Sequence, residues 1–256
     1  MTHQRVACEH CAHRKGRAFA EQITMAFQPI FDMTTGRVFA QEALLRGKDG
    51  RSAFEMLSLV DAENMYSFDQ TCRTTAIEVA AGLGLTASLS INFMPNAVYE
   101  PQTCIQRTLW AADSVGFPAE NIIFEFTEGE VVRDKGHLKN IIESYRQMGF
   151  RTAIDDFGAG FSGLGLIADV VPNIIKIDRE LVSGIDRDHV RRAIVRALCG
   201  LCDELGVMVV AEGIETQAEL ETLRDLGIAL MQGYLLGRPQ FEGLLHEPQA
   251  QPAVAA

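Results

Sequence analysis

The stretch VMVVAEGIETQAELETLRDLGIALMQGY, residues 207–234, contains a complete strand–helix–strand unit. VMVVAEG (207–213) and IALMQGY (228–234) are short apolar runs, which predicts two buried strands. TQAELETLRDLG (216–227) lies between them, spaces its apolar residues three and four positions apart and ends at a glycine, as helices commonly do. A helix between two buried strands predicts a parallel sheet or barrel in this part of the chain.

The helical spacing recurs outside this unit. It is found in the segments 68–84, 137–149 and 189–206. The last two of these also end at a glycine directly before the next apolar run, where a helix C-cap is expected. Thr216 is followed three residues later by Glu219, and this spacing fits a capping box at the start of the helix at 216–227.

Strand-like runs alternate with these helices along the whole chain. The eight candidates are 26–31, 37–45, 88–93, 121–126, 151–155, 174–178, 207–213 and 228–234. Only DMTTG (32–36) separates the first two, which is too short for a crossover helix, so these two strands should be antiparallel neighbours. The length of 256 residues suits one barrel of about 250 residues. We therefore expect an α/β fold, a modified (β/α)8 TIM-like barrel with one antiparallel strand near the N-terminus.

Composition narrows the class of protein. Apolar residues make up 47% and charged residues 22% of the chain, which is ordinary for a folded domain. The formal net charge of −11 argues against broad binding to DNA or RNA, which requires clustered basic residues. No run of 18 apolar residues is present, so we expect no membrane span, and no secretory signal precedes the barrel. These features predict a cytoplasmic protein.

The chain divides into three parts. We expect residues 1–22 to be a polar N-terminal leader with a Cys/His cluster, 23–245 to be the barrel, and 246–256 to be a flexible Pro- and Ala-rich tail. Cys8 and Cys11 in the leader have the Cys-x-x-Cys spacing with histidines nearby, and a structural metal or redox site is one interpretation. A polar leader without bound metal is favoured, because the second cysteine pair that zinc sites usually contain is missing.

Two further cysteines belong to a helical segment. Cys199 and Cys202 are three residues apart, which places both on one face of the helix at 189–206. Packing against the core is the better interpretation of this pair.

Polar residues gather near the ends of the predicted strands, where apolar ones would pack better. They are Glu42, Asn92, Glu125, Asp155 with Asp156, Lys176, Glu212 and Gln232. The C-terminal ends of barrel strands meet at one mouth, where active sites of this fold lie. Each residue taken alone has an ordinary alternative: Asp155 and Asp156 as helix caps, Asn92 as a turn residue, or Lys176 paired with Asp178. The whole set at strand ends favours one common site.

The chemistry of this set points to metal ions. Five carboxylates at one rim repel one another unless they are protonated or neutralised, and divalent cations neutralise them. Oxygen ligands with one amide favour Mg²⁺ or Mn²⁺ over zinc. Adjacent aspartates can serve two ions, and two ions about 4 Å apart can stabilise the attacking and leaving oxygens in phosphoryl displacement. Lys176 could then orient or deprotonate the attacking water, or screen charge on the phosphate.

Eight motifs in this order resemble one known family over residues 25–240. They are FQPI (27–30), EALLR (42–46), INFMP (91–95), EFTE (125–128), DDFGAGFSGL (155–164), KID (176–178), AEGIE (211–215) and QGYLLGRP (232–239). On these residues the chain resembles the EAL-domain cyclic di-GMP phosphodiesterases. The resemblance implies hydrolysis of cyclic di-GMP to linear pGpG, with two divalent cations, Mg²⁺ or Mn²⁺, as cofactors.

The resemblance also implies roles for single residues. The ligands of the first metal would be Glu42, Asn92, Glu125 and Asp155, and those of the second Asp155, Asp156 and Glu212. Lys176 matches the lysine that contacts the attacking water, and Gln232 the glutamine that helps to position this water.

Other positions match family residues around the metals. Arg46 matches the arginine that binds a substrate phosphate, and Gln28 lies where the family reads a guanine edge. Glu128 corresponds to the acid that steadies the loop after the double aspartate, and Glu215 to a glutamate with a structural or substrate-facing role.

The chain departs slightly from the family pattern in one loop. Phe161 and Gly163 stand where many members have Tyr and Ser, in the loop that links the metal site to dimer formation. The difference removes a hydroxyl group but no metal ligand, so it affects the coupling of this loop and leaves the chemistry intact. A homodimer and a regulatory protein partner are both compatible with this pattern.

Two other functions remain as alternatives. Some family members have lost catalysis and act as cyclic di-GMP receptors or protein-interaction modules, but these typically lack one of the acids or the lysine, and none is missing here. An aldolase-like barrel could use Lys176 as a Schiff-base nucleophile. Nearby carboxylates would raise the pKa of this lysine and disfavour that role.

Overall fold

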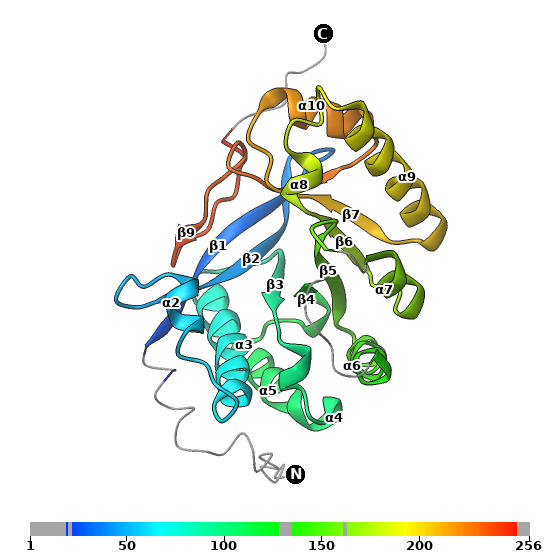
Figure 1. The fold of residues 1–256 in the computed structure, drawn as a ribbon. Helices are drawn as coiled ribbons and strands as arrows, with labels where there is room; N and C mark the ends of the chain where they lie inside the picture. Colours follow the sequence, from blue (N-terminus) through cyan, green and yellow to red (C-terminus); the bar gives the residue numbers. More distant parts are fainter. Residues whose placement is uncertain (1–18, 20–21, 128–134, 161–162, 250–256) are drawn as a thin grey trace.

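The computed structural model of this chain describes residues 19, 22–127, 135–160 and 163–249 (Figure 1). The Cys8–Cys11 pair, Glu128, Phe161 and most of the predicted leader and tail lie outside these residues. Phe19 falls within the predicted leader but is buried, with its ring 5.1 Å from that of Phe68 in an edge-to-face contact. Apolar packing therefore begins before residue 23.

An antiparallel hairpin starts the barrel. β1 (Ile23–Asp32) pairs with β2 (Arg37–Gly47) in antiparallel register, as the short connection predicts. The Asp32 carboxylate closes the turn by accepting a hydrogen bond of 2.9 Å from the backbone N–H of Thr34. β1 is also antiparallel to β8 (Leu230–Met231), so it is the one strand of the ring that runs against the others.

The other strands pair in parallel. They are β3 (Ser88–Asn92), β4 (Ile122–Thr127), β5 (Arg151–Phe157), β6 (Ile174–Ile177) and β7 (Met208–Ala211). The order runs from β2 through β8 to β1, and the β1–β2 pairing closes an eight-stranded ring, which confirms the predicted fold class. A ninth strand, β9 (Gln240–Phe241), pairs with β1 outside the ring. A strand of two residues is too short to produce a recognisable pattern in the sequence.

Helices surround the ring on its outside (Figure 1). They are α2 (Ala53–Leu57), α3 (Met65–Gly82), α4 (Pro101–Cys104), α5 (Gln106–Val115), α6 (Lys135–Gln147), α7 (Gly163–Asp169), α8 (Arg179–Val182), α9 (His189–Leu205) and α10 (Gln217–Asp225), with 3-10 turns η2 (Pro95–Ala97) and η3 (Ala119–Asn121). The four helices predicted from spacing correspond to α3, α6, α9 and α10. Thr216 and Glu219 form the predicted capping box, and Gly206 ends α9 in the left-handed conformation.

Two apolar layers hold the barrel together. The larger one lies between the ring and its helices, and it includes Cys202, while Cys199 packs against it; both thiols are free, as the packing interpretation predicts. The smaller one fills the inside of the ring and consists of Ile30, Ala40, Ile123, Ala153, Ile174 and Val210. Stacked layers of inward side chains are the usual filling of such a barrel.

Within the described ranges, no helix has both the length and the apolar character needed to cross a membrane.

Candidate active site at the barrel mouth

Polar side chains form the next level above the inner apolar layer. Two residues beyond a member of that layer, the strands β2, β4, β5, β6 and β7 carry or lead to Glu42, Glu125, Asp155, Lys176 and Glu212. Because side chains two residues apart lie on the same face of a strand, these groups also point into the ring. They therefore meet at the C-terminal ends of the strands, as the sequence predicts.

Lys176 lies at the centre of this level, with 1% of its surface exposed. Its Nζ is 2.8 Å from Glu212 Oε1, 2.9 Å from Asp155 Oδ1, 3.1 Å from Glu125 Oε2 and 3.3 Å from Glu42 Oε2. An ammonium group has three N–H donors, so it cannot donate a hydrogen bond to all four carboxylates. Asp155 Oδ1 is buried and close to Nζ, yet it has no hydrogen bond of good geometry.

The pKa values reflect this excess of negative charge. Burial raises the pKa of Glu125 to about 8; Lys176 opposes the rise, and Glu42 and Asp155 add to it. Burial also raises the pKa of Glu212 well above its ordinary value, again against the opposing effect of Lys176. For Lys176, burial lowers the pKa, but the surrounding carboxylates outweigh burial and raise it well above its ordinary value. Lys176 is therefore an ammonium ion at neutral pH, which disfavours the Schiff-base alternative.

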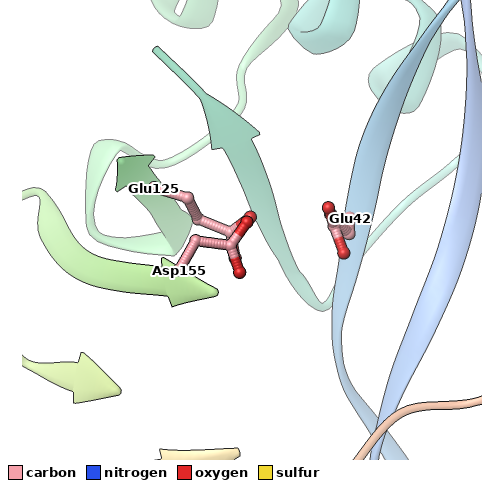
Figure 2. A group of neighbouring side chains, drawn as sticks. All are labelled: Glu42, Glu125 and Asp155. Atoms are coloured by element: carbon pink, nitrogen blue, oxygen red, sulfur yellow. The ribbon is translucent and has the colours of Figure 1, made fainter. Parts of the chain in front are cut away.

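The carboxylates fall into two overlapping groups that suit cations. Glu42, Glu125 and Asp155 form one, and Asp155, Asp156 and Glu212 the other; in each, the ligand oxygens lie within 4.8 Å of one another. Figure 2 shows Glu125 and Asp155 side by side on neighbouring strands, with Glu42 facing them from β2. With all five acids ionised, the group that they form with Lys176 carries a charge of −4. Two divalent cations would offset this charge, and the oxygen donors suit hard ions.

A bulge in β5 explains how two consecutive aspartates serve one site. In a regular strand, Asp155 and Asp156 would point to opposite faces. The pairing of β5 with β6 shifts register between Ile154 and Phe157, and Asp156 has a φ of 52°, which is unusual for a non-glycine residue. The bulge brings Asp156 to Asp155 and Glu212. Partial desolvation of its carboxyl group, and then the neighbouring Asp155 carboxylate, raise the pKa of Asp156 to about 6.

Amide groups hold the Glu42 carboxylate from two sides. Gln232 Nε2 donates to Glu42 Oε2 at 2.9 Å, and Asn92 Nδ2 donates to Glu42 Oε1 at 3.3 Å. Asn92 is thus directed at the acidic cluster and does not simply close a turn. Gln232 lies deeper, with 3% of its surface exposed, and orients Glu42 within the ring.

Ser90 is a site residue that the sequence reasoning missed. Its hydroxyl donates a short hydrogen bond to Glu125 Oε1, and the residue is fully buried. The strand pattern does indicate this position, because Ser90 lies two residues before Asn92 in SLSIN and so its side chain is on the same side of β3. A serine inside a strand carries too little chemistry by itself to be singled out.

The backbone links the ends of β7 and β8. Ile214 N donates to Gln232 O at 3.1 Å, and Gln232 N donates to Ala211 O at 2.8 Å. Gly233 packs so tightly here that an added Cβ would overlap the backbone N and O of Ile214 and come within 2.6 Å of its Cα. This contact fixes the positions of Glu212 and Gln232 relative to each other.

The remaining predicted residues lie around this cluster or outside the described part of the chain. Gln28 is opposite Glu42 in the β1–β2 register and donates to Gly237 O at 3.1 Å. Arg46 is half-buried, four residues beyond Glu42 on the same face of β2, and donates to Leu45 O at 2.7 Å. Both occupy positions from which a ligand at the mouth could be contacted.

Glu215 and Asp178 have partners other than the acidic cluster. Glu215 Oε1 lies 2.9 Å from Arg179 Nη2 in a partly exposed ion pair in the loop after β7. Asp178 caps α8 by accepting from Glu180 N at 2.8 Å, so the alternative pairing of Lys176 with Asp178 gives way to the four carboxylates. Glu128 lies outside the described residues.

The chain is similar to known proteins along most of its length. The sequence profile of the EAL domain matches residues 16–239. An antirepressor regulated by blue light and temperature, BluF of Escherichia coli, is 33% identical over 221 residues, which cover 86% of this chain and 55% of that protein. A cyclic di-GMP phosphodiesterase of Pseudomonas aeruginosa is 27% identical over 235 residues, or 89% of this chain and 40% of the relative. The chain thus spans about half the length of these curated relatives.

Solved structures share the fold. A standalone versatile EAL protein from Vibrio cholerae O395, in its c-di-GMP-bound form, is 50% identical with a TM-score of 0.85; the match covers 89% of this chain and 96% of that one. The Klebsiella pneumoniae protein BlrP1, in a manganese and cyclic di-GMP complex, is 33% identical with a TM-score of 0.84 and coverage of 94% and 60%.

Proposed function

This chain belongs to the EAL domain family, and on that premise we propose that it is a metal-dependent phosphodiesterase that hydrolyses cyclic di-GMP to linear pGpG. The observation that carries the proposal is the set of two carboxylate groups that share Asp155 around a buried Lys176. Such an arrangement would provide oxygen ligands for two divalent cations, which suits in-line displacement at a phosphodiester.

The residues present fit two divalent cations. Glu42, Asn92, Glu125 and Asp155 would hold one ion, and Asp155, Asp156 and Glu212 the other. The buried Asp155 Oδ1 without a good hydrogen bond and the net negative charge both favour added cations. When bound, such ions screen the phosphate charge and lower the pKa of water so that it can attack at neutral pH. We propose Mg²⁺ or Mn²⁺, in keeping with the oxygen ligands.

Lys176 acts as a hydrogen-bond donor in this proposal. In the metal-free protein its raised pKa keeps the side chain an ammonium group, which can orient the attacking water or donate a hydrogen bond to a phosphate oxygen. Gln232 holds Glu42 in place, and Ser90 does the same for Glu125. These contacts hold the Glu42 and Glu125 carboxylates in place before the substrate arrives.

Arg46 and Gln28 would bind the substrate. Both face the mouth beside Glu42, and a guanidinium has five N–H donors, so Arg46 can bind a phosphate oxygen in addition to Leu45 O. The Gln28 amide can both donate to and accept from a base edge. Cyclic di-GMP offers phosphates and guanine edges together, which matches these two groups.

A receptor or protein-interaction role is the second candidate. It is favoured by one observation: the relative from Escherichia coli is named an antirepressor. The complete set of acids and the lysine favours the phosphodiesterase.

The deciding experiment incubates the purified chain with cyclic di-GMP while Mg²⁺ or Mn²⁺ is titrated, and follows pGpG by chromatography. We expect metal-dependent product and loss of turnover in Glu42→Gln, because the first cation loses a ligand. Glu143→Gln is the matched control, since Glu143 lies in a solvent-exposed ion pair with Lys139 on α6. Binding of cyclic di-GMP without pGpG at any metal concentration would reject the phosphodiesterase and support the receptor.

A further inference from the structure

A buried ion pair lies outside the ring, away from the mouth. Asp69 and Arg73 are one helical turn apart on α3, and Arg73 Nη2 is 2.6 Å from Asp69 Oδ2. Arg73 has 0% and Asp69 3% of its surface exposed. Buried ion pairs are costly to desolvate and apolar pairs often replace them without loss of stability, so stability alone does not account for this one.

Aromatic rings enclose the arginine. Its guanidinium carbon lies 5.1 Å from the ring centre of Phe93 and 5.2 Å from that of Phe124, and Nη1 donates to the Tyr145 hydroxyl at 2.9 Å. Burial alone lowers the pKa of Arg73, but Asp69 and Tyr145 outweigh it and raise this pKa, so the side chain remains charged. The rings come from the residue directly after β3, from β4 and from α6, and the arginine therefore joins these three parts of the chain to α3.

The two strands in this cluster are those that carry metal ligands. Asn92 and Glu125 face the mouth. Phe93, directly after β3, and Phe124 on β4 are each one residue away from them and face the arginine, because neighbouring side chains alternate between faces. Phe93 N also donates to Glu125 O at 2.9 Å. The positions of Arg73 and the rings around it are thus coupled, through these two strands, to the positions of the proposed cation ligands Asn92 and Glu125.

Asp69 connects α3 directly to the segment that follows β3. Its Oδ1 accepts a hydrogen bond of 2.9 Å from Met94 N, two residues after Asn92 and just beyond the end of β3. Beyond Phe93 the parallel ladder no longer holds this segment, since β3 ends at Asn92. The Asp69 carboxylate holds this segment where the ladder has ended. Arg73 holds the carboxylate in the orientation that the hydrogen bond from Met94 N requires.

We propose that Asp69 is a positioning residue for cation binding, which fixes Asn92 through Met94 N and is itself oriented by Arg73. This inference rests on the proposed function, because it assigns Asn92 to the first cation. Asp69 and Arg73 contact neither substrate nor cation. Residues that orient metal ligands typically change metal affinity by about 10- to 100-fold when they are removed.

Two double variants separate positioning from stability. Asp69→Asn/Arg73→Met and Asp69→Leu/Arg73→Met both remove the buried charges and keep similar side-chain sizes. Only the asparagine retains an oxygen that can accept from Met94 N. Mn²⁺ binding is measured by electron paramagnetic resonance without substrate, and thermal unfolding is measured in chelator.

We expect Asp69→Leu/Arg73→Met to bind one Mn²⁺ about tenfold or more weakly than Asp69→Asn/Arg73→Met. The asparagine variant should bind the ions more tightly than the leucine variant does, but less tightly than the unaltered chain, because it keeps the acceptor for Met94 N and lacks the orienting Arg73. Equal Mn²⁺ affinity in the two double variants would overturn the inference. If the leucine variant does not fold, Asp69→Ala/Arg73→Met lacks the same acceptor and replaces it in the comparison. Failure of the unaltered chain to bind Mn²⁺ would instead contradict the proposed function.

Discussion

The charge on a single residue, Lys176, determines much of the chemistry of the mouth. Its ammonium group is the only partner with positive charge that the described residues bring within 3.3 Å of Glu42, Glu125, Asp155 and Glu212. In the metal-free protein these neighbours raise the pKa of Lys176, which makes it a hydrogen-bond donor at neutral pH. At the residue scale, therefore, neighbouring charge decides between a nucleophilic and a hydrogen-bonding lysine.

Replacement of Lys176 should separate catalysis from binding. In Lys176→Met we expect turnover to fall by about a hundredfold or more, since a preorganised donor to the reacting water or phosphate is lost. Affinity for cyclic di-GMP should change much less. Steady-state kinetics with Mn²⁺ and calorimetric binding measure the two effects, with Lys139→Met on exposed α6 as control. A loss of affinity with normal turnover would assign Lys176 to binding.

Proton competition should make cation binding depend on pH. In the metal-free protein the pKa of Glu125 is raised to about 8 and that of Asp156 to about 6, so cations must displace protons below these values. Mn²⁺ affinity should rise from pH 6 to pH 8. Calorimetric titrations at pH 6, 7 and 8 test this, and an affinity independent of pH would contradict the shared site.

The same pKa shifts predict an opposite trend for the metal-free fold. A Glu125 carboxyl with a pKa raised from 4.5 to about 8 retains a proton that the unfolded chain has already lost between these values. The folded state then binds more protons, so the free energy of unfolding should fall as pH rises through this window. Thermal unfolding in chelator measures the trend, and saturating Mn²⁺ should reduce it.

At the scale of elements, strand ends and their loops set the geometry. The β5 bulge turns two consecutive aspartates toward one site, and the β7–β8 contact at Gly233 holds Glu212 and Gln232 together. Both features are backbone arrangements with little room for adjustment, because the neighbouring atoms at Gly233 belong to the Ile214 backbone.

Substitution of Gly233 should therefore affect both stability and activity. In Gly233→Ala the added Cβ overlaps the Ile214 backbone, and we expect a loss of about 1–3 kcal/mol in the free energy of unfolding. Turnover should fall as well, because Glu212 and Gln232 move. Gly200→Ala is the control: Gly200 lies within α9 with nothing within 4 Å of an added Cβ, and alanine there should stabilise by about 1 kcal/mol. Urea unfolding and kinetics of both variants are the measurements; full activity in Gly233→Ala would show that the contact is not needed.

At the scale of the whole molecule, the closed ring gathers charge from distant parts of the sequence. The net charge of −11 is partly concentrated at one mouth, where five acids meet one lysine. Cation binding should therefore stabilise the entire fold, by an amount that grows with the logarithm of the cation concentration.

Ca²⁺ should inhibit hydrolysis when it competes with Mn²⁺ or Mg²⁺. It offers charge and prefers oxygen ligands, but its larger radius and looser geometry suit close, well-ordered coordination poorly. We expect Ca²⁺ to raise the unfolding temperature while it lowers the rate of pGpG formation. Stimulation of hydrolysis by Ca²⁺ would show that the site has been misinterpreted.

Local pattern by itself determined the repeating units of this protein. The spacing in α10, its capping box at Thr216 and the short segment DMTTG (32–36) at the β1–β2 turn are short-range signals, and each predicted the structure found. Because the C-terminal ends of barrel strands meet at one mouth, the sequence then also predicted a common site for five residues: Glu42, Glu125, Asp155, Lys176 and Glu212. These predictions succeeded because hydrophobic period and turn length depend on residues close in the chain.

Only the tertiary structure decided which side chains touch. Ser90 on Glu125, the bulge that turns Asp156 and the Asp69–Met94 hydrogen bond all depend on strand register and on contacts between elements. The closed ring also determined that Lys176 meets four carboxylates at once, and so determined its pKa. The physical reason is that electrostatic and packing energies depend on distances in space, and local sequence pattern does not specify these distances.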